Sequence, residues 1–278
     1  MIKIVIGTDG SEHATLALRW AVEEADVHNA DVQAVLAWSL LDQYRPDHSD
    51  RFDPHYGEDN ARAALTTWLT DALGEDTKVA PRVVCDLPAR AILEAGDVAD
   101  LIVVGARGTG GFEGLLLGSV SERVVQLANR PVAVVRALAP VRNGRVVVGI
   151  DGSARSVDAL RWAAVEARAR DADLDVVHGW RLPMMTLPPM YSALPDMSTM
   201  EELGREVLDA ALAEPALVGL SVKPHLVRGA PASALLERAA GAGVLVVGTR
   251  GLGRVSGALV GSVSRQLLHH APCPVVVV

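Results

Sequence analysis

Two glycine-rich segments with the same spacing are the parts of this sequence best suited to holding a ligand. In each, a glycine is followed after two residues by a second glycine and, nine residues later, by a Gly-Ser pair: Gly105, Gly108, Gly118 and Ser119 in the first, and Gly248, Gly251, Gly261 and Ser262 in the second. Glycine lets backbone N–H groups approach an anion closely, and a helix N-terminus adds unpaired donors and a positive dipole potential. The spacing therefore predicts two phosphate-binding loops, although either segment alone could be a plain turn between a strand and a helix.

Two better-known phosphate-binding motifs do not describe these loops. A P-loop needs a lysine beside its Ser or Thr to reach the outer phosphates, and the three lysines of the chain, Lys3, Lys78 and Lys223, lie outside both loops. In the dinucleotide pattern GxGxxG, Glu113 and Ser256 take the place of the third glycine. The sequence thus indicates neither the machinery of kinases and GTPases nor a dinucleotide fingerprint.

Composition narrows the class of protein further. The 278 residues are 50% hydrophobic, which is ample for a core, and the formal net charge of -8 argues against a broad nucleic-acid-binding surface. The N-terminal stretch has five apolar residues before a turn, too few for a signal peptide, and no apolar run approaches the length of a membrane span. We therefore expect a cytoplasmic protein in which Cys85 and Cys273 are free thiols.

The chain is a tandem duplication. Asp9 matches Asp151 and Trp38 matches Trp180 at an offset of 142 residues, whereas Gly105 matches Gly248 at 143. A period of this size corresponds to domains rather than to a solenoid. We expect one domain over residues 1–139 and a second over 145–278, joined by a connector at 140–144.

Strand and helix patterns alternate within each half. In the first half we expect strands at 2–7, 31–38, 79–85, 101–105 and 131–136, and helices at 14–29, 57–73, 88–95 and 119–128. Such alternation predicts parallel βαβ units and a sheet covered on both faces. Ligands of these sheets bind beyond the carboxyl ends of the strands, where the strand order reverses. If the first and fourth strands are neighbours, Asp9 faces its loop across that crevice, as Asp151 does in the second half.

The repeated Asp-Gly-Ser after the first strand and the repeated glycine loop resemble the universal stress protein family, in its tandem, ATP-binding, actinobacterial form. The resemblance covers nearly the whole chain. It implies an α/β protein of two tandem Rossmann-like (adenine nucleotide alpha hydrolase-like) domains, each a five-stranded parallel sheet with flanking helices. It also implies pairing of domains through their last strands, residues 131–136 and 274–278, which a tandem chain could make internally.

The same resemblance implies one ATP site in each domain, where Mg2+ could accompany the phosphates because the loops lack lysine. Asp9 and Asp151 would contact adenosine, and Ala37 and Gly179 would lie against adenine. Thr8 and Ile150, which precede the aspartates, differ between the halves and make unequal affinities possible. The phosphates and ribose would be held by the loop residues Gly105, Arg107, Gly108, Gly118, Ser119, Val120 and Ser121, and by Gly248, Arg250, Gly251, Gly261, Ser262, Val263 and Ser264.

Other interpretations stay open at this point. The aspartates could be helix caps, although Ser11 and Ser153 are available for that role. Arg107 and Arg250 could clamp a phosphate or simply be solvated. We expect no metal site of the protein's own, because the cluster His48, Asp50, Asp53 and His55 has no counterpart in the second half.

The function that the resemblance implies is regulatory, in stress or dormancy, rather than catalytic. A slow ATP hydrolase is one alternative, which the lack of a matched lysine or an evident general base opposes. An interaction scaffold without nucleotide is the other, which two intact loops oppose. Homodimers are possible, and protein partners cannot be named from the sequence.

Overall fold

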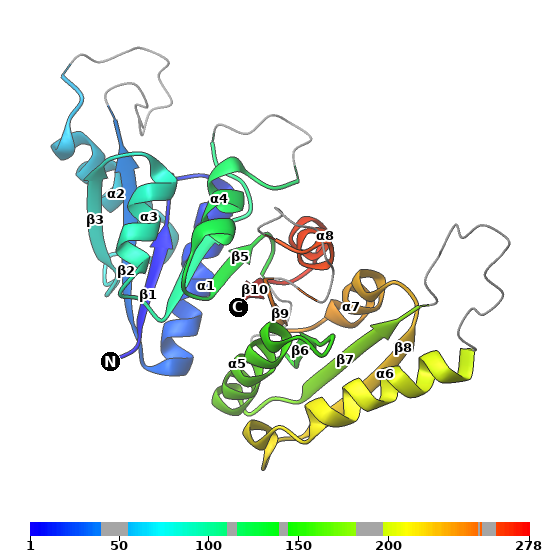
Figure 1. Cartoon of the computed structure of the whole chain (residues 1–278). Coiled ribbons are helices and arrows are strands. Elements are labelled where there is room, and N and C mark those ends of the chain that lie inside the picture. Colours follow the sequence, from blue (N-terminus) through cyan, green and yellow to red (C-terminus); the bar gives the residue numbers. More distant parts are fainter. Residues whose placement is uncertain (40–54, 110–115, 139–143, 182–196, 250, 252–259) are drawn as a thin grey trace, which may run out of the picture. The chain divides into compact units, whose positions relative to one another are not determined.

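The computed structural model describes residues 1–39, 55–109, 116–138, 144–181, 197–249, 251 and 260–278. The chain forms two compact units, Met1–Leu138 with Pro272–Val277, and Ala139–Ala271 with Val278 (Figure 1). Most of the predicted connector, and three of the four residues in the loop cluster named above, His48, Asp50 and Asp53, lie outside the described residues. None of the helices in the described ranges combines the length and the apolar character needed to cross a membrane.

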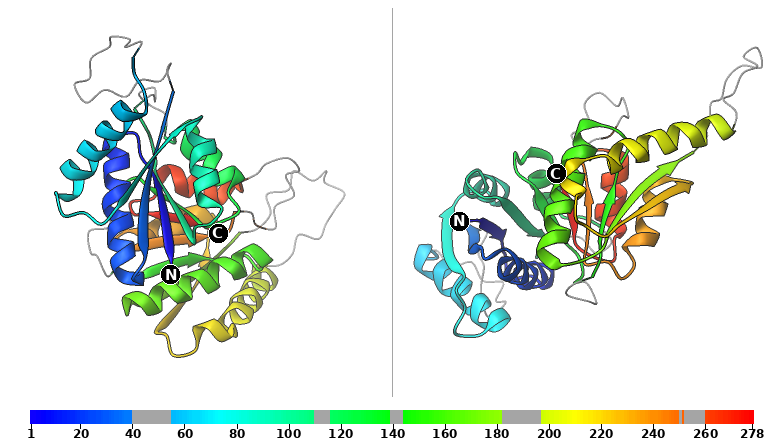
Figure 2. Two further views of the ribbon diagram at one scale, coloured as in Figure 1. Left: turned by 90° about the vertical axis from the view of Figure 1, so that its left-hand side faces the viewer. Right: turned by 90° about the horizontal axis from the view of Figure 1, so that it is seen from below.

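Unit 1 is built on a parallel sheet in the order β3-β2-β1-β4-β5. Its strands are β1 (Lys3–Gly7), β2 (Asp31–Trp38), β3 (Ala80–Cys85), β4 (Leu101–Gly105) and β5 (Val132–Val135). Its helices are α1 (Glu12–His28), α2 (Glu58–Leu73), α3 (Pro88–Gly96) and α4 (Ser119–Leu127). Helices α1 and α2 lie on one face of the sheet, and α3 and α4 on the other (Figure 2). The predicted α/β fold is confirmed.

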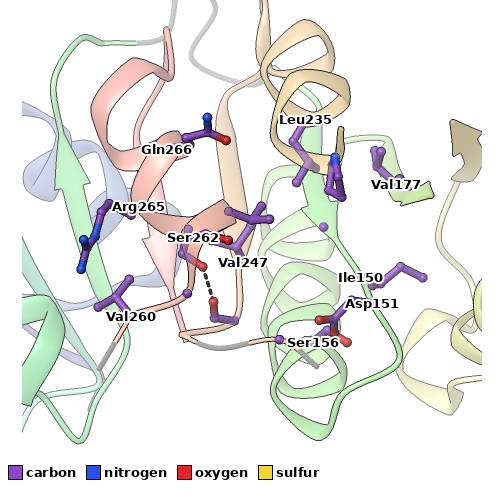
Figure 3. A pocket seen from close by; sticks show the side chains of 18 of the residues that line it. Ile150, Asp151, Ser156, Val177, Leu235, Val247, Val260, Ser262, Arg265 and Gln266 are labelled. Carbon is purple, nitrogen blue, oxygen red and sulfur yellow. Dashed lines mark hydrogen bonds between the residues drawn. The ribbon is translucent and has the colours of Figure 1, made fainter. Parts of the chain in front are cut away.

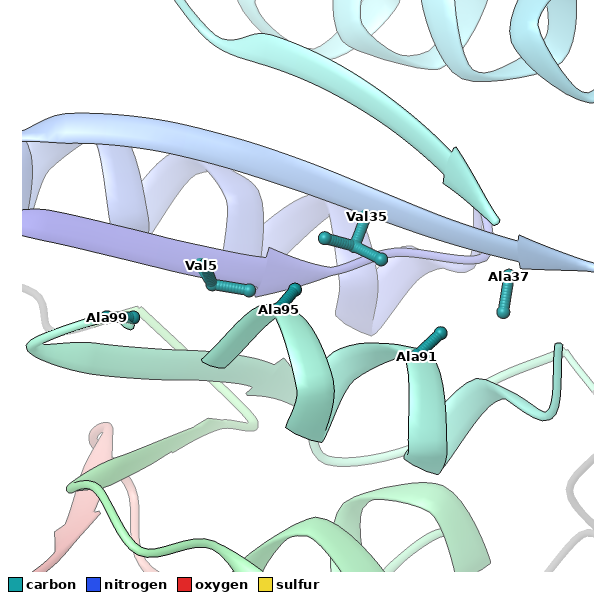
Figure 4. Packing of buried hydrophobic residues seen from close by; sticks show 6 residues of the cluster. All are labelled: Val5, Val35, Ala37, Ala91, Ala95 and Ala99. Atoms are coloured by element: carbon teal, nitrogen blue, oxygen red, sulfur yellow. The ribbon is translucent and has the colours of Figure 1, made fainter. Parts of the chain in front are cut away.

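Small side chains set the spacing between α3 and the sheet. Val5, Val35 and Ala37 on the strands form a buried cluster with Ala91 and Ala95 of α3, joined by Ala99 (Figure 4). Alanine at helical spacing lets α3 lie close to β1 and β2, and the valines fill the remaining space. This packing fixes α3 beside the carboxyl ends of the strands, where a ligand would bind.

The last strand of the sequence, β10 (Val275–Val277), joins the sheet of unit 1. It pairs antiparallel with β5, with Val276 opposite Ala133. This is the internal pairing of last strands that the family resemblance implied. It covers the edge of β5 that would otherwise present unpaired N–H and C=O groups.

Unit 2 repeats the same plan with the parallel order β9-β6-β7-β8. Its strands are β6 (Val146–Gly149), β7 (Leu174–Trp180), β8 (Val222–Arg228) and β9 (Val244–Val247). Its helices are α5 (Ala154–Arg170), α6 (Met197–Leu212), the 3-10 turn η1 (Pro215–Leu217), α7 (Pro231–Ala239) and α8 (Ser262–His270). Val278 extends the hydrogen bonding along β9, because its N–H donates to Val247 O at 3.0 Å.

Candidate functional site

In both units the strand order reverses beside the strand that precedes Asp-Gly-Ser, β1 in unit 1 and β6 in unit 2. β1 pairs with β2 on one side and with β4 on the other, and β6 pairs in the same way with β7 and β9. The expected neighbour relation between the first and fourth strands is therefore present. It places each aspartate and its glycine loop at the same carboxyl edge of a sheet, which is where open α/β sheets form their ligand crevice.

Asp9 fastens the first glycine loop to the end of β1. One carboxylate oxygen accepts a hydrogen bond from the Ser11 N–H at 3.1 Å, and the other accepts from the Thr109 N–H at 2.8 Å. Gly108 passes so close that a Cβ there would lie 2.3 Å from the Asp9 carboxylate. The cap of α1 is Ser11, whose hydroxyl accepts from the Ala14 N–H at 3.2 Å. Asp9 is therefore not the helix cap.

Asp151 takes the same position in unit 2. Its carboxylate accepts from the Ser153 N–H at 3.0 Å, and Ser153 caps α5 by accepting from the Ser156 N–H at 3.2 Å. A Cβ on Gly251 would lie 2.0 Å from the Asp151 carboxylate. The second glycine of each loop is thus required by close contact with an aspartate, and in unit 1 the aspartate also holds the loop through the Thr109 N–H.

Each Gly-Ser pair begins a helix that no described side chain caps. Gly118 is the N-cap of α4 and Gly261 that of α8, and neither position has a side-chain capping bond. Their own N–H groups donate back into the loop, to Ala106 O and to Thr249 O, both at 2.8 Å. The N–H groups of the next three residues are then the open donors of the helix, Ser119 to Ser121 in α4 and Ser262 to Ser264 in α8. Such donors bind anions.

The serine two positions after each Gly-Ser pair has a structural role. The buried Ser121 hydroxyl donates to Gly105 O at 2.6 Å, and the buried Ser264 hydroxyl donates to Gly248 O at 2.8 Å. These bonds tie the helix start to the strand end. The two hydroxyls are therefore committed to the fold as donors, which leaves their backbone N–H groups available to a ligand, while the hydroxyl-bearing Ser119 and Ser262 are exposed.

The first glycine of each loop is also explained by packing. A Cβ on Gly105 would lie 2.7 Å from the backbone carbonyl atoms of His13, and one on Gly248 would lie 2.9 Å from Arg155 O. These distances are shorter than real Cβ contacts, so α1 and α5 can approach only a glycine. We expected both glycines to shape the loop around a ligand, and the structure gives them a role in seating the first helix of each unit.

The strands beside the crevice offer backbone groups. The Thr8 N–H donates to Val35 O, and the Ile150 N–H donates to Val177 O, both at 3.0 Å. Since the polar groups of alternate residues point to the same side of a strand, those of Ala37 and Gly179 point past the ends of β1 and β6. Gly179 also has to be small, because a Cβ there would lie 2.7 Å from Pro231 Cα.

In unit 2 these features line one cleft of about 820 Å3, within the usual range for small-molecule sites. Figure 3 shows Ile150 and Asp151 on one side of it and Ser262 on the other. Nine of the ten residues predicted for this half line it, namely Ile150, Asp151, Gly179, Gly248, Gly251, Gly261, Ser262, Val263 and Ser264. The tenth, Arg250, lies outside the described residues.

The cleft also contains polar residues that sequence reasoning did not select. Arg181 follows β7, and Arg265, Gln266 and His269 line the cleft from α8. The last three stand three, four and seven positions after Ser262, a spacing that places them on one face of a helix. That helical spacing was the signal that could have identified them.

Arg107 lies in a cationic environment on the α1 side of its loop. Its guanidinium is 3.5 Å from His13 Nε2, and the Ser11 hydroxyl donates to its carbonyl oxygen at 3.3 Å. Burial, followed by the charges of Arg107 and Arg136, holds the pKa of His13 below its usual value. Burial and then Arg107 lower the pKa of Arg136. A clamp on phosphate by Arg107 stays a prediction.

The fold and the repeated crevice define a tandem doubly wound α/β protein. The family model described as the universal stress protein family matches residues 1–136 and again 142–278. The chain belongs to the universal stress protein family.

Its relatives share the tandem arrangement over almost their whole length. A universal stress protein of Mycolicibacterium smegmatis is 33% identical over 292 residues, which cover 99% of this chain and 96% of the relative. One from Mycobacterium tuberculosis is 30% identical over 287 residues, with the same coverage. Among solved structures, a universal stress protein from Archaeoglobus fulgidus aligns over 99% of this chain and 97% of its own with a TM-score of 0.67 and 22% identity, and so shares the fold.

Proposed function

We propose that each unit binds one adenine nucleotide, ATP, in the crevice between its aspartate and its uncapped helix. The observation that carries this proposal is the pair of helix starts, at Gly118 and Gly261, whose backbone donors are left open beside a glycine loop. Backbone N–H groups at a helix N-terminus are a ready site for phosphate oxygens. Two such sites in one chain, in matching surroundings, favour a shared ligand over two unrelated turns.

The nucleotide would lie across the crevice, with its phosphates at the helix start and its adenosine toward the strand ends. In unit 2 the N–H groups of Ser262 to Ser264 would receive the phosphates, and the exposed Ser262 hydroxyl would add a donor. Asp151 stands at the opposite side of the cleft (Figure 3), and Gly179 also lines the cleft, so a ribose or a base could bond to them. Ala37 and Asp9 have the matching places in unit 1.

We propose a regulatory role rather than a catalytic one. Neither loop has the lysine that phosphoryl-transfer loops direct at the outer phosphates, so Mg2+ is the natural counter-charge for the phosphates. A nucleotide that binds one arrangement of the loops better than another shifts the protein toward that arrangement. Partner proteins would then bind differently to the nucleotide-bound and nucleotide-free forms, because the surface around the crevice differs between them. Membership of the universal stress protein family supports a place in stress physiology.

The proposal can be tested by introducing a negative charge at each position where the phosphates should bind. Ser119→Glu combined with Ser262→Glu puts carboxylates on two exposed helix starts, where they suit the helix dipole and leave the fold intact. We expect ATP to raise the melting temperature of the wild type, because a ligand far above its Kd stabilises the folded state. The double variant should lose that response, and Ser119→Gln with Ser262→Gln, which has similar side-chain size without the charge, should keep most of it.

Two outcomes would point to other functions. Sustained ATP hydrolysis by the wild type that disappears in the glutamate variant would favour an enzyme. A folded wild type that ATP neither stabilises nor binds in calorimetry would favour an interaction scaffold.

A further inference from the structure

The N-termini of α4 and α8 have the same backbone geometry, but the side chains in their first turns have opposite charges. Gly118 has φ -76° and ψ 152°, and Gly261 has φ -66° and ψ 157°. Both precede three open N–H groups, and in both units a buried serine hydroxyl ties the helix to the strand end. Differences in what the two clefts bind must therefore come from the side chains around them.

The largest difference in charge between the two units lies in the first turn of these helices. α4 has Glu122 in its first turn, whereas the matching residue of α8, 143 positions later, is Arg265. Both are exposed. A carboxylate near a helix N-terminus offsets the positive dipole end and repels an incoming phosphate, whereas a guanidinium attracts it. Arg265 lines the cleft, and its side chain projects from α8 on the side away from Asp151 (Figure 3). If the adenosine lies toward Asp151, as proposed above, the phosphate chain extends toward this side.

At two more matched positions, unit 2 has a basic residue where unit 1 has an uncharged one. Arg181 lines the cleft of unit 2, and the residue at its place in unit 1 is Ser39. His269 also lines the cleft, where unit 1 has Gln126. The change at Gln266, which is Arg123 in unit 1, runs the other way.

The formal charges at these matched positions differ by two. In unit 1, Asp9 and Glu122 against Arg123 give -1. In unit 2, Asp151 against Arg181 and Arg265 gives +1, with His269 counted as neutral.

We propose that the two clefts differ in how strongly they prefer ATP to adenine nucleotides with fewer phosphates: unit 2 favours ATP over AMP more strongly than unit 1 does. This rests on the proposed function and refines the ligand preference of each site. Every phosphate added to the chain brings roughly one more negative charge toward position 265 or 122. That charge meets a guanidinium in unit 2 and a carboxylate in unit 1. The ratio of Kd for AMP to Kd for ATP is then about tenfold larger in unit 2 than in unit 1.

The experiment measures each site in a full-length chain in which the other is blocked. Ser119→Glu blocks unit 1 and Ser262→Glu blocks unit 2, and AMP and ATP are titrated calorimetrically at one fixed ionic strength, with and without Mg2+. With unit 1 blocked, we expect Arg265→Glu to weaken ATP binding about tenfold and AMP binding much less, with Arg265→Gln between the two. With unit 2 blocked, Glu122→Arg should tighten ATP binding by a similar factor. Both substituted side chains are exposed, so these variants should fold.

The results separate this inference from the proposed function. Equal AMP-to-ATP ratios in the two sites, or an Arg265→Glu variant that weakens both nucleotides equally, would overturn the inference and leave nucleotide binding standing. Failure of the wild type to bind either nucleotide would overturn both.

Discussion

Replacing Gly105 with alanine tests whether this glycine serves the fold or the ligand. The new Cβ would lie 2.7 Å from the carbonyl carbon and oxygen of His13 and 2.8 Å from Ala14 N. Ordinary contact begins near 3.4 Å, so α1 would have to move away from the end of β4 by roughly 0.7 Å. These are backbone atoms of a capped first turn, which cannot rotate aside. Overpacking of this kind costs about 1–3 kcal/mol, which corresponds to a melting temperature lowered by about 3–10 °C.

The measurement is thermal unfolding followed by circular dichroism, without nucleotide. Gly118→Ala is the matched control, because its Cβ would meet Arg107 Cα at 3.4 Å and Ala106 O at 3.5 Å, and we expect its stability to change by less than about 0.5 kcal/mol. Gly248→Ala, whose Cβ would lie 2.9 Å from Arg155 O, should destabilise unit 2 as Gly105→Ala destabilises unit 1. If Gly105→Ala unfolds within 1 °C of the wild type, close packing against α1 is not the reason for the glycine.

Three further predictions concern the same loop. Ser121→Ala removes the hydroxyl that donates to Gly105 O and leaves a buried carbonyl unsatisfied, so chemical denaturation should show a loss of about 1–3 kcal/mol; an unchanged midpoint would contradict the tie between helix and strand. Gly108→Ala displaces the Asp9 carboxylate from the Thr109 N–H, and hydrogen exchange at that amide should become faster than in the wild type. His13, whose pKa is lowered by burial and two arginines, should titrate below 6.5 in NMR spectra. Because the unfolded chain binds that proton more readily, its contribution to stability is full above pH 6.5 and falls as the pH drops toward the folded pKa, and His13→Gln should flatten this dependence.

The sequence was sufficient for most of the elements and for the place of the candidate cleft in unit 2. Asp31–Trp38 and Leu101–Gly105 were predicted with the bounds that the structure has, because each is an apolar run between turn residues. The start of α1 was predicted two residues late, since the polar Glu12 and His13 hide a helix that Ser11 already caps. The position of the crevice was predicted from the tandem repeat, because the matching residues occur in the same order in both halves.

The roles of single residues in the loop were harder to predict, because they depend on contacts between distant parts of the chain. The sequence suggests that Gly105 is a glycine because of a ligand, whereas the structure shows that α1 packs too closely against it for a side chain. The sequence also predicted that the Ser121 hydroxyl binds phosphate, whereas the structure shows that this hydroxyl donates to Gly105 O at the strand end and leaves the backbone N–H for a ligand. The charge on α8 was readable in principle, since Arg265 and His269 share a helical face with Ser262, but only the cleft shows that this face is the relevant one.

The antiparallel partner of β5 has a consequence for how the protein is made. β5 ends at Val135, and the strand that covers its edge begins at Val275, about 140 residues later. At ribosomal rates of about 5–20 residues per second, roughly 7–28 s pass between the synthesis of β5 and that of β10, and the rest of the first unit can fold in that time. During this interval, β5 of neighbouring nascent chains on one messenger could pair with each other instead. The order of synthesis thus exposes, until β10 is made, an apolar strand edge that the finished protein covers.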